Sequence, residues 1–250
     1  MRTNYIKGGI IMATLHTSKN DLRKKIRQNN LISLGAWLFF FVYLILSTVN
    51  HWFLVLFTLP LFFSMGASYF FLNKNKILQI GLEGEEKALM LVKDLDDSYH
   101  VFSNISIRYE GQKSELDLIV VGKKGVFVVE VKNYRGEIEG KEDERFWKQH
   151  KVGRKGTRYT QEFYSPVKQV STHVYRLSKI LKSDNVYTWV QGVVYFVNNE
   201  VDITQVETNQ IPVLSFDTPL VTYLEELDTK GEMTEEKLMS IITILNSRIQ

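Results

Sequence analysis

The chain has 250 residues, of which 44% are hydrophobic and 24% charged, and its formal net charge is +3. This length fits one domain of ordinary size, or a small domain with an attached segment. The absence of cysteine excludes disulfide bonds, thiolate zinc sites, iron–sulfur clusters and a cysteine nucleophile.

The first 30 residues are basic, and we expect residues 1–30 to form a cytoplasmic segment. Within it, Lys7-Gly8-Gly9 can be encoded by the codons AAA-GGA-GGA, which form a bacterial ribosome-binding sequence. Two codons separate this sequence from Met12. We therefore expect that the chain is bacterial, that its translation starts at Met12 and that residues 1–11 are an over-extended reading frame.

The next segment carries no Lys, Arg, Asp or Glu from Gln28 to Asn73. It contains two apolar runs, residues 31–49 and 52–72, and each has the roughly 20 residues that an α-helix needs to cross a membrane. We predict a transmembrane helical hairpin over residues 31–72, with its turn at Asn50 and His51. The alternative, a buried helical hairpin in a soluble fold, would need an unusually long uncharged stretch for a small core.

Both flanks of the predicted hairpin are basic, with five Lys and Arg residues between Lys19 and Arg27 and two more at Lys74 and Lys76. Basic flanks stay in the cytoplasm, and two crossings return the chain to the side that it left. We expect a multi-pass protein of the cell membrane whose N-terminus and C-terminal domain are both cytoplasmic. A transporter or channel component is disfavoured because the spans carry no charged residue to mark a transport path.

Residues 79–250 have a globular pattern and are predicted to form one α/β domain with a mixed sheet. Apolar stripes and caps predict helices at 83–95, 166–182, 219–227 (capped by Thr218) and 234–249. Runs rich in β-branched and aromatic residues predict strands at 100–108, 115–121, 125–132, 188–197 and 211–216. Residues 136–156 are predicted to be turn-rich, with Trp147 packed under the strands.

Carboxylates and a lysine converge in the predicted hairpin that turns at residues 122–125. Glu130 and Lys132 are two residues apart and share a face, and Asp117 lies opposite Glu130 across the hairpin. Glu85 heads the apolar stripe of the first helix and faces inward. Two carboxylates can hold Mg²⁺, or Mn²⁺, and a lysine can stabilise a phosphoryl transition state. For the Glu-x-Lys pattern alone, a structural ion pair at a strand end is the alternative.

The order of several motifs resembles the nuclease-related domain (NERD) family, which itself resembles the PD-(D/E)XK nuclease superfamily. The motifs are Gly81-x-x-Gly84-Glu85, Glu115-Leu116-Asp117, Val129-Glu130-Val131-Lys132-Asn133, Gly136, Trp147 and Ser165-Pro166-x-x-Gln169. The resemblance implies a restriction-endonuclease-like (αβββαβ) domain in which Asp117 and Glu130 bind the metal. It also implies that Lys132 acts beside them, and that Glu85 and Gln169 complete the catalytic site. Leu116 departs from the proline that often precedes the metal-binding aspartate.

Charge is distributed unevenly along the chain. Residues 1–78 sum to +8, residues 148–182 to +8 and residues 183–250 to −8. The second basic stretch predicts contact with a polyanion, either nucleic acid or anionic lipid. We expect a membrane-anchored, Mg²⁺-dependent nuclease acting on DNA or RNA. The alternative is a membrane-tethered nucleic-acid-binding or regulatory module that keeps the nuclease scaffold without physiological turnover.

Overall fold

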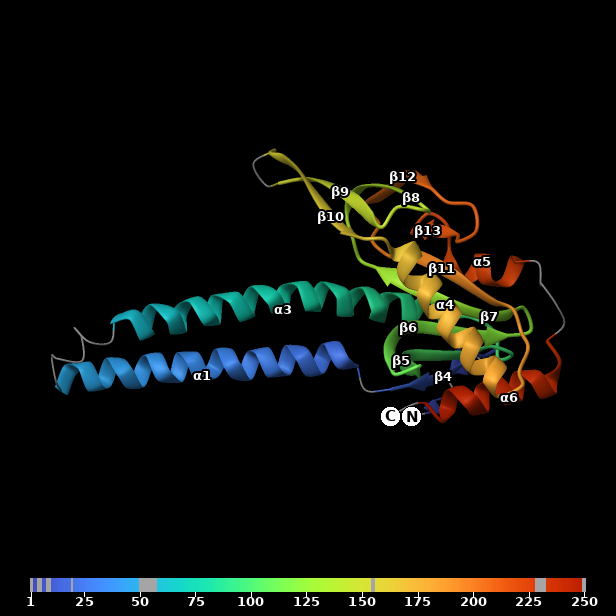
Figure 1. The fold of residues 1–250 in the computed structure, drawn as a ribbon, viewed down its shortest axis with the longest axis horizontal. Coiled ribbons are helices and arrows are strands. Elements are labelled where there is room, and N and C mark those ends of the chain that lie inside the picture. Colours follow the sequence, from blue (N-terminus) through green and yellow to red (C-terminus); the bar gives the residue numbers. More distant parts are fainter. Residues whose placement is uncertain are drawn as a thin grey trace. The chain divides into compact units, whose positions relative to one another are not determined.

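The computed structural model describes residues 2–3, 6–7, 10–18, 20–49, 58–153, 156–227 and 233–248. The chain forms two compact units (Figure 1). One is helical and comprises Asn20–Glu83; the other is a mixed α/β unit that combines Met1–Lys19 with Gly84–Gln250. The mixed sheets of the second unit confirm the predicted α/β class.

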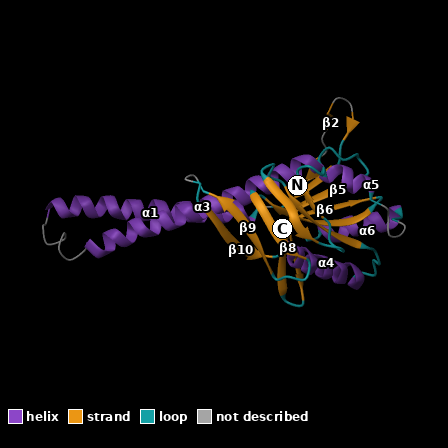
Figure 2. Cartoon of the chain, turned by 90° about the horizontal axis from the view of Figure 1, so that it is seen from above, coloured by secondary structure: helices purple, strands orange, loops and turns teal. Residues whose placement is uncertain are grey.

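The helical unit contains α1 (Asp21–Val49) and most of α3 (Thr58–Val92), which run side by side (Figure 2). Buried polar side chains join the two helices. The Asn29 amide donates to Asn75 Oδ1 over 2.7 Å, and the Ser33 and Ser68 hydroxyls lie 2.7 Å apart. Large apolar side chains such as Phe63 instead point outward, with 79% of its surface exposed.

The described residues contain one helix long and apolar enough to cross a membrane, Asp21–Leu46. The second predicted span is not confirmed. Its first six residues, and the predicted turn at Asn50 and His51, lie outside the described residues, and α3 carries the remainder from Thr58.

The predicted helix at 83–95 is not a separate element, because α3 runs without a break from the apolar segment to Val92. The sequence predicted that the second apolar span ends at residue 72 and that a separate helix begins at residue 83. A change in polarity does not end a helix, however, and no proline occurs between residues 61 and 165.

The larger sheet has seven strands in the order β1-β4-β5-β6-β7-β11-β13. The strands are β1 (Arg2–Thr3), β4 (Thr14–Thr17), β5 (His100–Tyr109), β6 (Gln112–Gly122), β7 (Gly125–Lys132), β11 (Val190–Phe196) and β13 (Val213–Ser215). The three central strands are antiparallel, with the predicted turn at 122–125, and β7, β11 and β13 are parallel. A separate short pair joins β2 (Ile6–Lys7) to β3 (Ile10–Ile11).

Each face of this sheet has its own apolar core. One core includes α4 (Pro166–Ser183) and α6 (Glu235–Asn246), and the other includes the last turns of α3 and α5 (Leu220–Glu226). Thr234 caps α6 as predicted, accepting the Lys237 N–H over 3.3 Å. The prediction of Thr218 as the cap of α5 is wrong, since Pro219 occupies the cap position and makes no side-chain cap bond.

Residues 136–156 are largely strands rather than turns. They form β8 (Gly136–Lys141) and β9 (Phe146–Val152), which join β10 (Arg158–Tyr164) and β12 (Val201–Glu207) in a four-stranded sheet. Dense charge on the exposed faces hid the alternating pattern. Trp147 is fully buried, as predicted, and its indole N–H donates to the Lys141 carbonyl over 2.9 Å. Gly140 makes room for the indole, because a Cβ there would lie 2.3 Å from the ring.

The structure extends the predicted domain of residues 79–250 toward the N-terminus. Strand β4 precedes α1 in sequence, yet it pairs with β5 in the central sheet, with Leu15 opposite Val101. Leu15 and Ala13 are buried in the core. The α/β unit is therefore built from chain on both sides of the helical unit, and residues 79–250 alone lack one of its internal strands.

Candidate active site

Strand β7 carries the centre of the candidate site. Its residues alternate between the two cores up to Val129, and this alternation directs Glu130 and Lys132 to the face that α4 covers. Glu130 is 1% exposed. The Lys132 ammonium donates to Glu130 Oε1 over 2.5 Å and to Gln169 Oε1 over 3.1 Å. The predicted Glu-x-Lys pair is thus in direct contact with the predicted glutamine of α4.

Asp117 lies where β6 separates from β7. The backbone ladder between the two strands runs from the turn to the pair Leu118 and Val129 and ends there. The next free N–H, that of Val131, donates to Asp117 Oδ2 over 2.9 Å. Asp117 therefore occupies the position opposite Glu130 that the sequence predicted, at a point where its side chain replaces a backbone partner.

Helix α4 presents two side chains to the site. Ser165 caps the helix by accepting the Lys168 N–H over 3.4 Å, and Pro166 occupies its first turn. This start sets the phase in which Gln169 and His173, four residues apart, both face β7. Arg176 does not reach the site, because its guanidinium donates to the Lys113 carbonyl over 3.2 Å.

His173 is the residue that sequence reasoning did not assign. Its Nδ1 lies 3.5 Å from Glu130 Oε2, and neither atom has a hydrogen-bond partner among the described residues. Burial, then the positive charges of Lys132 and Arg176, lower the pKa of His173 to about 4, so the ring is neutral at physiological pH. The sequence signal that could have assigned His173 to the site was its spacing of four residues from Gln169, which places both side chains on one face of the helix.

Glu85 lies near the end of β7. The neighbouring Gly84 packs so closely that an added Cβ would lie 2.7 Å from the Asn133 Cβ. Burial raises the pKa of Glu130, Lys132 opposes the rise, and the negative charge of Glu85 adds to it. Glu85 is therefore within electrostatic reach of Glu130.

The two central carboxylates resist ionisation. Burial, followed by the neighbouring Glu130, raises the pKa of Asp117 to about 8. Burial disfavours the Lys132 ammonium, but Glu130 and Asp117 outweigh this effect and hold the pKa of Lys132 above its usual value. The cluster thus has two carboxyl groups for one ammonium, and a further cation would favour their charged forms, as expected of a metal site.

The donor set suits a hard divalent cation. The described residues include no group of three or more His, Asp and Glu side chains placed to hold a metal ion. Mg²⁺, however, is commonly held by one or two carboxylates, with water and substrate phosphates in the other positions. Asp117 and Glu130 supply two such carboxylates, and the buried Glu130 Oε2 has no hydrogen-bond partner within the described part of the chain. The residues therefore fit the predicted Mg²⁺.

Comparison with known proteins agrees with the motifs. Residues 80–197 match the family model of the nuclease-related domain, NERD. This match supports the family resemblance, and it spans the five predicted site residues. The chain is also 36% identical over 92 residues to an uncharacterized protein of Bacillus anthracis. That alignment covers 36% of this chain and 43% of the relative, so the chain spans less than half of the relative's length. No solved structure matches the chain.

Proposed function

We propose that the protein is a membrane-anchored, Mg²⁺-dependent nuclease of PD-(D/E)XK type that hydrolyses phosphodiester bonds of DNA or RNA. The observation that carries this proposal is the buried contact of Glu130 with Lys132, opposite Asp117 at the point where β6 leaves β7. The NERD match gives the proposal independent support.

Four of the five site residues have the following roles in the proposed reaction. Asp117 and Glu130 would hold Mg²⁺, which when bound lowers the pKa of a water and offsets negative charge on the phosphate. Lys132 orients the attacking water and donates to the phosphoryl oxygens as their charge grows. Gln169 fixes the Lys132 ammonium through its 3.1 Å contact.

The fold supports anchoring by a hairpin. Strand β4 precedes α1, and β5 follows α3, yet the two strands pair in one sheet. Residues 14–17 and 100–103 must therefore lie on the same side of any membrane. A chain that enters the membrane through α1 has to return, so the number of crossings is even.

The surface of the helical unit also fits a membrane. Leu38, Phe62 and Phe63 are each at least 66% exposed, while Ser33, Ser64 and Ser68 are buried. A soluble helical pair shows the opposite pattern, whereas membrane helices pack through small and polar residues. We therefore retain the two-span anchor in the cell membrane, with the α/β unit in the cytoplasm, as part of the proposal.

The second candidate function is a tethered nucleic-acid-binding or regulatory module without turnover. One observation favours it: no third metal-ligating side chain joins Asp117 and Glu130 in the described residues. The same site then binds without cleaving, and activity distinguishes the two functions.

The test is a cleavage assay on DNA and RNA with Mg²⁺ or Mn²⁺. It uses the full chain in mild detergent, because residues 77–250 alone would lack β4. Glu130→Ala and Lys132→Ala are expected to abolish cleavage. Lys113→Ala is the matched control, since it breaks an exposed Lys–Glu pair with the same 2-residue spacing. Cleavage that persists in both site variants would refute the site. Absence of cleavage on every substrate, with retained binding, would favour the module.

A further inference from the structure

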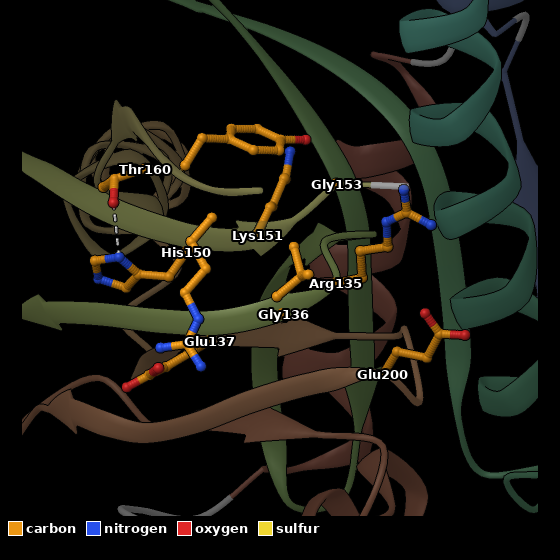
Figure 3. A pocket seen from close by; sticks show the side chains of 11 residues that line it. Arg135, Gly136, Glu137, His150, Lys151, Gly153, Thr160 and Glu200 are labelled. Carbon is orange, nitrogen blue, oxygen red and sulfur yellow. Dashed lines mark hydrogen bonds between the residues drawn. The ribbon is translucent and has the colours of Figure 1, made fainter. Parts of the chain in front are cut away.

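The four-stranded sheet and the chain beside it form a second candidate site, an open cavity of about 930 Å³ (Figure 3). We call it the arm cavity. Arg135, Glu137, Lys151, Arg158, Tyr159 and Glu200 are among the residues that line it. His150 joins three strands in its wall, accepting or donating to Thr160 of β10 over 2.9 Å and to Glu139 of β8 over 3.0 Å. The wall is thus held in place before any ligand enters.

The arm cavity is adjacent in the chain to the candidate active site. Arg135 follows Lys132, the last residue of β7, by three residues. Gly136, the next residue, has a φ of 84°, and a Cβ there would lie 2.3 Å from the His150 carbonyl oxygen. This close approach turns the chain from the catalytic strand directly into the cavity wall.

Three of the lining residues are basic. None of the carboxylates described by the structure forms an ion pair with Arg135, Lys151 or Arg158, although Glu137 and Glu200 also line the cavity. Burial, then the charge of Arg135, lowers the pKa of Lys151, which indicates that the two cations repel each other. An anion between them would relieve that repulsion.

The same observations refine the predicted basic stretch at 148–182. Lys148 lies 3.5 Å from Glu139, because β8 pairs with β9. Its charge is therefore partly neutralised by a strand outside the stretch. Lys151 and Arg158 lack such partners among the described carboxylates, so the arm cavity keeps positive charge of the kind that Glu139 partly neutralises at Lys148.

We propose that the arm cavity binds a single-stranded segment of nucleic acid beside the site of cleavage, with backbone phosphates on Arg135 and Lys151 and a base on Tyr159. The proposal takes its ligand class from the proposed function. Tyr159 is 47% exposed and lines the cavity, so its ring can receive a base. Bases stack on aromatic side chains only when they are free of a duplex, and basic grooves track the backbone of single strands in this way.

The test measures binding of a fluorescent single-stranded 12-nucleotide DNA to the full chain in mild detergent with EDTA, so that no cleavage occurs. Each phosphate contact on a single strand contributes a salt slope of about 0.7, which corresponds to about fivefold in affinity at 0.1 M salt. Arg135→Ala and Lys151→Ala should each weaken binding about fivefold, and the double variant about 25-fold with a slope lower by about 1.4. Tyr159→Ser should weaken binding at least about fivefold.

Lys148→Ala is the matched control, because it removes the same charge from the same strand outside the cavity lining. A double variant that binds no more weakly than Lys148→Ala would overturn the proposal. Equal affinity of the wild type for single-stranded and duplex DNA would also overturn it. So would a double variant that binds phosphatidylglycerol vesicles more weakly than the wild type but binds the oligonucleotide equally well. Because binding is measured without metal, it is independent of cleavage. A chain that cleaves no substrate but binds the oligonucleotide through Arg135 and Lys151 would refute the proposed nuclease activity and support nucleic-acid binding in the arm cavity.

Discussion

Replacing Asp117 by asparagine should stabilise the metal-free protein at neutral pH. The pKa of Asp117 is raised from 3.8 to about 8 by burial and by Glu130. Between these two values the folded chain retains a proton that the unfolded chain has released. The free energy of unfolding therefore falls as pH rises through this window, by about 1.4 kcal/mol per pH unit from this group. Asparagine keeps an oxygen for the Val131 N–H and removes the titration.

The magnitude follows from the width of the window. Since pH 7 lies about three pH units above 3.8, titration of Asp117 lowers the free energy of unfolding of the wild type by about 4 kcal/mol at that pH. The small fraction of Asp117 that is ionised at pH 7 pairs with Lys132, and the variant loses this pairing, which reduces the gain. We expect Asp117→Asn to stabilise the chain by about 2–4 kcal/mol at pH 7 and by almost nothing at pH 4.

The assay is urea unfolding of the full chain and the variant in detergent with EDTA, from pH 4 to pH 8. The difference between the two proteins at each pH cancels the other titrating groups. Addition of Mg²⁺ should stabilise the wild type and not the variant. A difference that does not change with pH, or an asparagine variant that is less stable at pH 7, would refute this account of the site.

Three further predictions concern the fold around the site. The pH dependence that His173 contributes to stability is opposite in sign to that of Asp117. Because the pKa of His173 is lowered to about 4, the free energy of unfolding falls as pH drops from 6.5 to 4, and His173→Gln should remove up to about 3 kcal/mol of this loss in the same urea series. Trp147→Ala should cost about 3–5 kcal/mol in urea unfolding, against less than about 1 kcal/mol for the exposed neighbour Phe146→Ala; equal costs would contradict the burial of the indole. Gly84→Ala should lower the thermal midpoint by crowding Asn133, whereas Gly81→Ala, where a Cβ would meet its nearest atom at 3.6 Å, should leave it unchanged or raise it. A Gly84→Ala protein as stable as Gly81→Ala would contradict the close packing of α3.

The sequence by itself determined the elements whose signals are local. Runs of β-branched and aromatic residues and a Gly-rich turn are properties of neighbouring residues, and they predicted the hairpin of β6 and β7 with Asp117 opposite Glu130. A proline in the first turn followed by an apolar stripe predicted α4, and the family resemblance assigned Gln169 to the site. The missed strands β8 and β9 show the limit of this approach. Their exposed positions are so highly charged that the buried Ile138 and Trp147 were not recognised as part of an alternating strand pattern.

Only the tertiary structure decided the relations between distant segments. Pairing of β4 with β5 joins the segments that precede and follow the helical unit in the sequence. No short-range pattern in residues 14–17 predicts a partner strand 86 residues away. His173 is a site residue because β7 places Glu130 beside it. Lys148 is partly neutralised because β8 places Glu139 beside it. Burial and through-space charge, which set the pKa values of Asp117 and His173, depend on all surrounding elements at once, and linear spacing carries no record of them.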